Sequence, residues 1–109
     1  MSERFEVMRD LALDDVMALK KAQVSYGDSW KRRGGVGAFM MLARKWDRIE
    51  NQTTKTGYDI FGAVSAFPGK EGMMDDINDL IRYLMLVRAE VLPAADDGGE
   101  PTQGYVDQG

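Results

Sequence analysis

Apolar residues recur every three or four positions in three stretches of the chain, the spacing that places side chains on one face of an α-helix. The first stretch predicts a helix over residues 13–24, with Asp14 as its N-cap. The second predicts a helix over 38–50, and the third predicts the longest helix, over 71–92, ended by Pro93. The three stripes consist of Leu13, Val16, Met17 and Val24; of Phe39, Leu42, Trp46 and Ile49; and of Met73, Ile77, Leu80, Ile81, Leu84, Val87 and Val91. The pattern predicts an all-α fold.

The segments between and beyond these helices are rich in residues that end regular structure. Residues 26–37 contain four glycines and are predicted to be a loop, and 51–68 are predicted to be a long connection with room for a short helical turn. Residues 80–87 are hydrophobic nearly all round, so a bundle or a subunit interface is expected to bury them. The composition of 93–109 is typical of a disordered acidic tail. We therefore expect a helical domain over 1–92 and a flexible tail over 93–109.

The length and composition favour one small, soluble domain that associates with itself. With 109 residues, of which 44% are hydrophobic, the chain has a core but leaves much of its surface exposed. A homodimer or a homotetramer is the expected assembly. No stretch is long and apolar enough for a membrane span, and the charged first residues do not resemble a secretory signal. We expect a cytoplasmic protein without a membrane partner.

The chain contains neither cysteine nor histidine, and this limits its chemistry. Disulfides, thiolate nucleophiles and the most common general base are excluded. Carboxylates that hold a hard divalent cation such as Mg²⁺ are the natural catalytic groups that remain. Four of the 18 acidic residues lie beyond Pro93, which leaves 14 acidic against 14 basic residues before it. This balance argues against a dedicated nucleic-acid binder.

Two pairs of carboxylates are candidates for such a site. Asp47 and Glu50 are three residues apart on the second predicted helix, and Asp76 and Asp79 are three apart on the third, so each pair shares one side of its helix. Antiparallel packing could bring the four together around a divalent metal ion. The metal would bind a triphosphate and activate water, with Glu50 and Asp79 as the catalytic candidates. Alternatively, both pairs lie on ordinary solvated helix faces.

Cationic and aromatic residues near these pairs could bind a nucleotide. Lys45 and Arg48, together with Lys31 and the neighbouring Arg32 and Arg33, could balance charge on a departing pyrophosphate. A base could stack on an aromatic ring, although aromatic residues more often belong to a core. The candidate rings are Trp30, Tyr83 and Tyr26.

Three segments together resemble small phage and bacterial proteins of the all-α NTP pyrophosphatase superfamily, of which MazG is the best-known branch. They are Tyr26-Gly27-Asp28-Ser29-Trp30, residues 43–51 and residues 75–83. The resemblance implies hydrolysis of a nucleoside triphosphate to monophosphate and pyrophosphate, with Mg²⁺ or Mn²⁺, in a dimer or tetramer. Phage relatives are similar to dATP/dGTP pyrophosphohydrolases that adjust nucleotide pools, which implies the cytoplasm of a bacterial or phage-infected cell.

The two acidic pairs of the superfamily correspond here to Asp47-x-x-Glu50 and Asp76-x-x-Asp79. Asp replaces Glu twice, and Arg44 and Lys45 stand where MazG itself is usually acidic. A related phage pattern instead weights Lys45, Arg48, Glu71, Asp75 and Asp79, so Glu71 and Asp75 are reserve candidates for the site.

Two other classes of function are compatible with the sequence. One is a non-enzymatic helical protein that binds a partner through the apolar helix predicted over 71–92. The other is a nucleotide sensor that binds a triphosphate and metal without hydrolysis.

Overall fold

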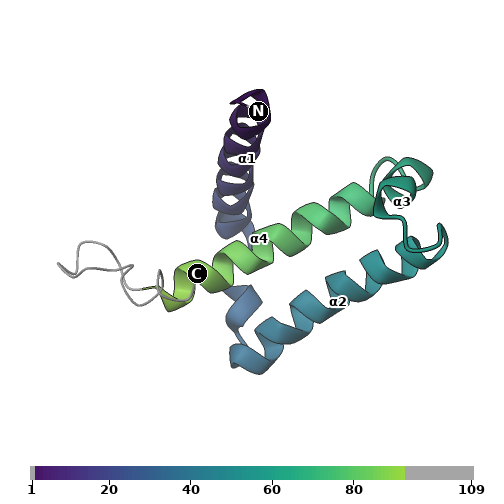
Figure 1. Cartoon of the computed structure of the whole chain (residues 1–109). Coiled ribbons are helices and arrows are strands. Elements are labelled where there is room, and N and C mark those ends of the chain that lie inside the picture. The colour runs from purple at the N-terminus through teal and green to yellow at the C-terminus, as the bar shows by residue number, and fades with distance from the viewer. Residues whose placement is uncertain (1, 93–109) are drawn as a thin grey trace.

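The computed structural model describes residues 2–92, and these form four α-helices and one 3₁₀ turn (Figure 1). The elements are α1 (Ser2–Tyr26), η1 (Ser29–Lys31), α2 (Gly34–Thr54), α3 (Ile60–Ala66) and α4 (Met73–Val91). No strand occurs within this range, which confirms the predicted all-α class for it. None of the described helices is both long and apolar enough to cross a lipid bilayer. The tail predicted over 93–109 lies outside the described residues.

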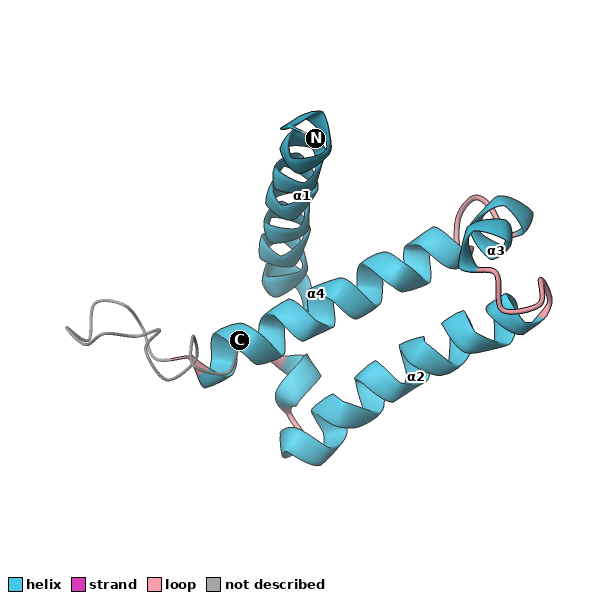
Figure 2. Cartoon of the chain, in the orientation of Figure 1, coloured by secondary structure: helices cyan, strands magenta, loops and turns pink. Residues whose placement is uncertain are grey.

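The helices α2 and α4 lie side by side as an antiparallel hairpin, and α3 closes the end at which they are connected (Figure 2). Ile49 of α2, Ala63 of α3 and Met73 of α4 form the buried core at this end. Partly buried apolar side chains surround them, namely Val64, Phe67, Ile77 and Leu80. The predicted connection over 51–68 is therefore mostly helical, and the short helical turn expected in it is confirmed as α3.

The turn between α3 and α4 is folded tightly on itself. Met73 donates its backbone N–H to the carbonyl of Phe67 at 3.0 Å, and Gly72 donates to Gly69 at 3.1 Å. A Cβ added at Gly72 would meet the carbonyl oxygens of Phe67, Pro68 and Gly69. Only glycine allows the backbone to approach this closely, so Gly72 fixes where α4 begins.

The first helix is longer than its apolar stripe predicted. It begins at Ser2 rather than near residue 13, and with 25 residues it exceeds the 19 of α4, so the prediction of α4 as the longest helix was wrong. Asp14 lies inside α1 and does not cap it. The reason is that residues 2–26 contain no glycine or proline, and good helix formers continue a helix without a single-sided apolar stripe.

The second helix begins at Gly34, four positions before its predicted start, so three of the four glycines in the predicted loop are helical. The buried face of α2 also differs from the predicted stripe. Ile49 is 5% exposed, but Phe39 and Trp46 are 63% and 54% exposed. The face of α2 that packs against α4 instead carries Lys45 and Gln52, whose side chains contact α4.

Few apolar residues are buried within residues 2–92. Those with less than a tenth of their surface exposed are Ala38, Ile49, Ala63 and Met73. In the segment 80–87, which was expected to be buried on several sides, Ile81 and Leu84 remain 42% and 48% exposed. Residues 2–92 therefore leave much of their apolar surface without a neighbour.

Candidate functional site

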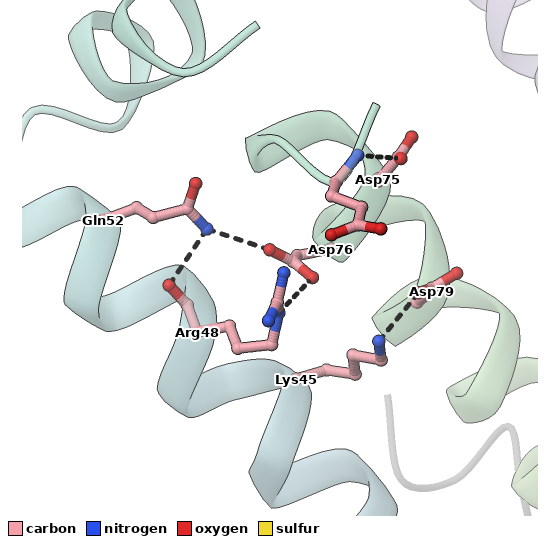
Figure 3. A network of polar contacts seen from close by, with 7 residues as sticks. Lys45, Arg48, Gln52, Asp75, Asp76 and Asp79 are labelled. Atoms are coloured by element: carbon pink, nitrogen blue, oxygen red, sulfur yellow. Dashed lines mark hydrogen bonds and ion pairs between the residues drawn. The ribbon is translucent and has the colours of Figure 1, made fainter. Parts of the chain in front are cut away.

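A row of polar side chains joins the facing sides of α2 and α4 (Figure 3). Lys45, Arg48 and Gln52 follow each other at helical spacing on α2, and Asp76 and Asp79 do so on α4. Lys45 Nζ lies 2.9 Å from Asp79 Oδ2, and Arg48 Nε lies 2.8 Å from Asp76 Oδ1. Each acidic side chain of this row thus has a cation opposite it.

Asp76 is the most deeply buried charged residue described, with 1% of its surface exposed. Its second oxygen, Oδ2, accepts a hydrogen bond of 2.9 Å from Gln52 Nε2, so both oxygens have partners. The hydrogen bond to Asp76, followed by the charge of that carboxylate, raises the pKa of Arg48 above its ordinary value. A buried carboxylate with these partners is stable in place, and its position in the first turn of α4 suits the helix dipole.

The other two acidic candidates lie elsewhere on α2. Asp47 and Glu50 are both exposed. Each follows a residue of the inner face by two positions, a rotation of roughly 200° around a helix, so they point away from α4 while Lys45 and Arg48 point toward it. Within residues 2–92 no three acidic side chains are grouped closely enough to hold a metal ion. The convergence of four carboxylates is therefore not found inside one chain.

The reserve candidates have a local structural role. Glu71 has a φ of 63°, in the left-handed region, and its backbone N–H donates to Asp75 Oδ2. Asp75 thereby satisfies a backbone group at the start of α4.

A cleft of about 570 Å³ opens between the C-terminal half of α1, the η1 turn and α4. Four residues selected from the sequence line it together, namely Trp30, Tyr83, Asp79 and the more exposed Tyr26. Its other walls are mainly apolar, with Arg82 and Gln23 as additional polar groups. The remaining lining residues are Ala18, Leu19, Ala22, Gly27, Ser29, Met41 and Leu86. An aromatic, mostly apolar cleft with a carboxylate and a guanidinium has the character of a small-ligand site.

The sequence did not reveal the ion pair that connects α1 to this cleft. Arg82 Nε lies 2.8 Å from Asp15 Oδ1, and Asp15 is only 9% exposed. Asp15 interrupts a row of small and apolar residues formed by Leu11, Ala18, Leu19 and Ala22. An acid in such a row indicates a buried partner, and this signal could have identified it.

Lys31, a predicted phosphate-binding residue, lies on another surface. Its Nζ is 2.8 Å from Glu90 Oε2 at the end of α4, and that hydrogen bond, with the charge of Glu90, raises the pKa of Lys31 above its ordinary value. Lys31 lines a second, more apolar cleft of about 400 Å³ together with Phe39 and Val91, and Trp30 lines both clefts. Among the predicted substrate residues, Tyr83 and Lys31 therefore lie in different clefts that meet at Trp30, whereas Lys45 and Arg48 lie in the polar row between α2 and α4.

Comparisons of this chain with protein-family models, with curated proteins and with solved structures gave no match. The resemblance to the all-α NTP pyrophosphatase superfamily thus stays a prediction from the three sequence segments.

Proposed function

We propose that the chain hydrolyses a nucleoside triphosphate, with dGTP or dATP favoured, to the monophosphate and pyrophosphate. The proposed setting is the cytoplasm of a bacterial or phage-infected cell, where the reaction would control nucleotide pools. The observation that supports this proposal best is the meeting of Trp30, Tyr83 and Asp79 in one cleft. The cleft volume of about 570 Å³ falls in the usual range for small-molecule sites.

The aromatic rings provide the proposed base site. Trp30 and Tyr83 come from η1 and α4, and both are partly buried, so their faces are held by surrounding structure. Any nucleobase can stack on such rings, because stacking does not depend on the base's pattern of hydrogen-bond donors and acceptors. Leu19 and Leu86 supply further apolar wall.

The phosphates would extend toward the polar end of the cleft. Arg82 lines the cleft, and Lys45 reaches Asp79 from α2. Guanidinium and ammonium groups stabilise negative charge on phosphoryl oxygens as it develops in the transition state. Arg48 extends this cationic row along α2.

In the proposed reaction a water molecule attacks the α-phosphorus, and the bond to the oxygen that bridges the α- and β-phosphates breaks. The electron pair of that bond leaves with the pyrophosphate. Asp79 orients the water and accepts its proton, because it is the carboxylate that lines the cleft. Glu50 lies on the opposite side of α2, so it would contribute only to a site shared with a second copy.

Mg²⁺ or Mn²⁺ belongs to the proposal, but the acidic side chains do not fit a divalent-ion site as they are arranged. Arg48 and Gln52 occupy both oxygens of Asp76, and Lys45 occupies Asp79. The Lys45–Asp79 pair is the easier one to open, because Asp79 is 42% exposed at its side chain whereas that of Asp76 is 2% exposed. The proposed step at Asp79 therefore uses only side chains of this chain, and turnover with and without added Mg²⁺ or Mn²⁺ measures any dependence on the metal.

Product analysis tests the proposal directly. The purified chain is incubated with each common ribo- and deoxyribonucleoside triphosphate, with and without Mg²⁺ or Mn²⁺, and the products are resolved. We expect monophosphate and pyrophosphate, and a loss of turnover of about 100-fold or more in Asp79→Asn, the usual effect of removing a general base. Glu3→Gln is the control and should leave turnover unchanged, because Glu3 is an exposed residue at the N-terminal end of α1, away from the cleft. Diphosphate and phosphate as products, or no turnover, would contradict the proposal.

The base site can be tested apart from the chemistry, because the chain has only two tryptophans. Nucleotide binding should change the fluorescence of Trp30 in the cleft. Trp30→Phe should abolish the change, whereas Trp46→Phe should preserve it, since Trp46 lies on α2 and does not line the cleft.

The exposed apolar surface favours a second candidate, a helical interaction protein. Ile81 and Leu84 on α4 are about half exposed, and so are other large apolar side chains. Such a protein would keep its partner binding in Asp79→Asn and would show no nucleotide turnover. The buried Asp76 is unsuitable for this comparison, because its replacement would also disturb the hairpin.

A further inference from the structure

The helix α1 has apolar side chains on two opposite faces. One face carries Leu19 and Ala22 against the cleft beside α4. The other carries Leu13, Met17 and Val24, with exposed fractions of 59%, 62% and 88%. Together with Lys20, which continues the row, these three residues are called the outer α1 face. A helix that is apolar on both sides is normally buried on both sides.

The N-terminal half of α1 extends beyond the rest of the chain (Figure 1). Phe5, Met8 and Leu11 are each more than half exposed, although they follow the line of the face that meets α4 further on. The ion pair from Asp15 to Arg82 and the cleft residues from Ala18 onward mark where contact with α4 lies. A projecting helix in water is only marginally stable without a neighbour, so a further contact is needed.

The charges along the outer α1 face are distributed unequally. Asp10 and Asp14 flank its N-terminal half, whereas Lys20 and Lys21 lie in its C-terminal half. Asp14, Lys20 and Lys21 are exposed and make no ion pair within residues 2–92, and Asp10 has only a long 4.0 Å contact with Arg9. A second α1 in antiparallel orientation would place the acidic half of each helix beside the basic half of the other.

We propose that the outer α1 face is a self-association surface, on which α1 of a second copy docks antiparallel. A twofold axis near Met17 places Asp14 of each copy opposite Lys21 of the other, and the two Met17 side chains meet at the centre. The interface is isologous, so one patch serves both subunits. The charge pattern favours a second copy over an unrelated partner, because the acidic and basic halves of this face match those of an identical face in antiparallel orientation. The proposal does not depend on the nucleotide chemistry.

Sedimentation of the full chain without nucleotide tests the surface. The parent chain should be a dimer or a multiple of a dimer. Met17→Glu should weaken association about 100-fold or more, since it brings like charges together at the axis. Val7→Glu is the matched control, because Val7 is 55% exposed on α1 but lies outside the overlap of the two helices. The axis that pairs position 14 with position 21 would place position 7 opposite position 28, beyond the end of α1 at Tyr26. A monomeric parent, or equal effects of the two variants, would overturn the proposal. Circular dichroism checks that each variant is folded.

Exchanging the charges tests the antiparallel register. Asp14→Lys and Lys21→Asp should each weaken the dimer about tenfold, and the double variant should recover most of the loss. Because the chain has no cysteine, Met17→Cys introduces a single thiol. Air oxidation should link Met17→Cys into a covalent dimer and should leave Val7→Cys unlinked. No recovery in the double variant, or no preferential link at position 17, would show that the helices do not pair in this way.

Discussion

The α2–α4 hairpin and α1 each contain a nearly buried aspartate paired with an arginine, but their surroundings are different. In the hairpin, Asp76 has partners on both oxygens and lies beside a core that three helices share. In α1, Asp15 is held by Arg82 alone among the described polar contacts, and most of the helix around it is exposed. The same kind of pair therefore completes a packed unit in one region and attaches a separate helix in the other.

The difference follows from chain connectivity and from the number of apolar faces. A tight turn holds α3 against α4, so the hairpin gains its core and its polar row from segments close in sequence. Within residues 2–92, α1 has two apolar faces but packs mainly against α4, and its second face is left uncovered. The radius of gyration of 16.2 Å, against about 13 Å for a compact domain of this length, reflects the same extension.

Gly72→Ala should break the hairpin and should have the largest effect. The added Cβ meets three backbone oxygens that cannot move away as a flexible side chain could. We expect a loss of about 3 kcal/mol in the free energy of unfolding, seen as a large drop in melting temperature. Gly35→Ala is the control, because a Cβ there meets nothing within 4 Å. Gly35 is in the first turn of α2, so the melting temperature should stay the same or rise slightly. Equal melting curves for the two variants would contradict the close approach at Gly72.

The hairpin helices were predictable because each has one dominant apolar period. The prediction over 71–92 lies within two residues of α4, whose ends are fixed by Gly72 and by the approach to Pro93. The N-terminal half of α1 was missed because its apolar residues are distributed over two faces and give no single stripe. The glycines at 34, 35 and 37 indicated a loop, yet the first turn of a helix tolerates glycine well.

The candidate site was predictable in part. Trp30, Tyr83 and Asp79 were selected by residue type and do line one cleft. The orientation of Asp47 and Glu50 was not predictable, because the large side chains of Phe39 and Trp46 suggested a buried stripe that remains exposed. The face of α2 that is buried is set by its contacts with the acidic residues of α4. Because these contacts join segments distant in sequence, the periodicity of α2 alone could not predict them.

Asp15→Ala should separate α1 from the hairpin. Arg82 would lose its partner. We expect the free energy of local unfolding of α1 to fall by about 1 to 2 kcal/mol, whereas the free energy of unfolding of the core should not change. Hydrogen exchange should therefore become faster in residues 15–26 and stay unchanged in α2 and α4. Asp76→Ala is the matched change inside the hairpin and should instead lower the melting temperature of the whole chain. If Asp15→Ala speeds exchange equally in all helices, α1 is not a separate unit.

The smallest effect is expected at the far end of the hairpin, where Lys31 pairs with Glu90 on the surface. Because the pKa of Lys31 is raised above 10.5 in the folded chain, its stabilising contribution is complete below that value. The contribution is lost as the pH rises through the higher pKa of the folded state. Glu90→Gln should thus lower the melting temperature slightly and by a constant amount from neutral pH to just below 10.5, and the difference from the parent chain should shrink at higher pH. A difference that grows with pH above that value would show that the pair does not stabilise the folded chain in this way.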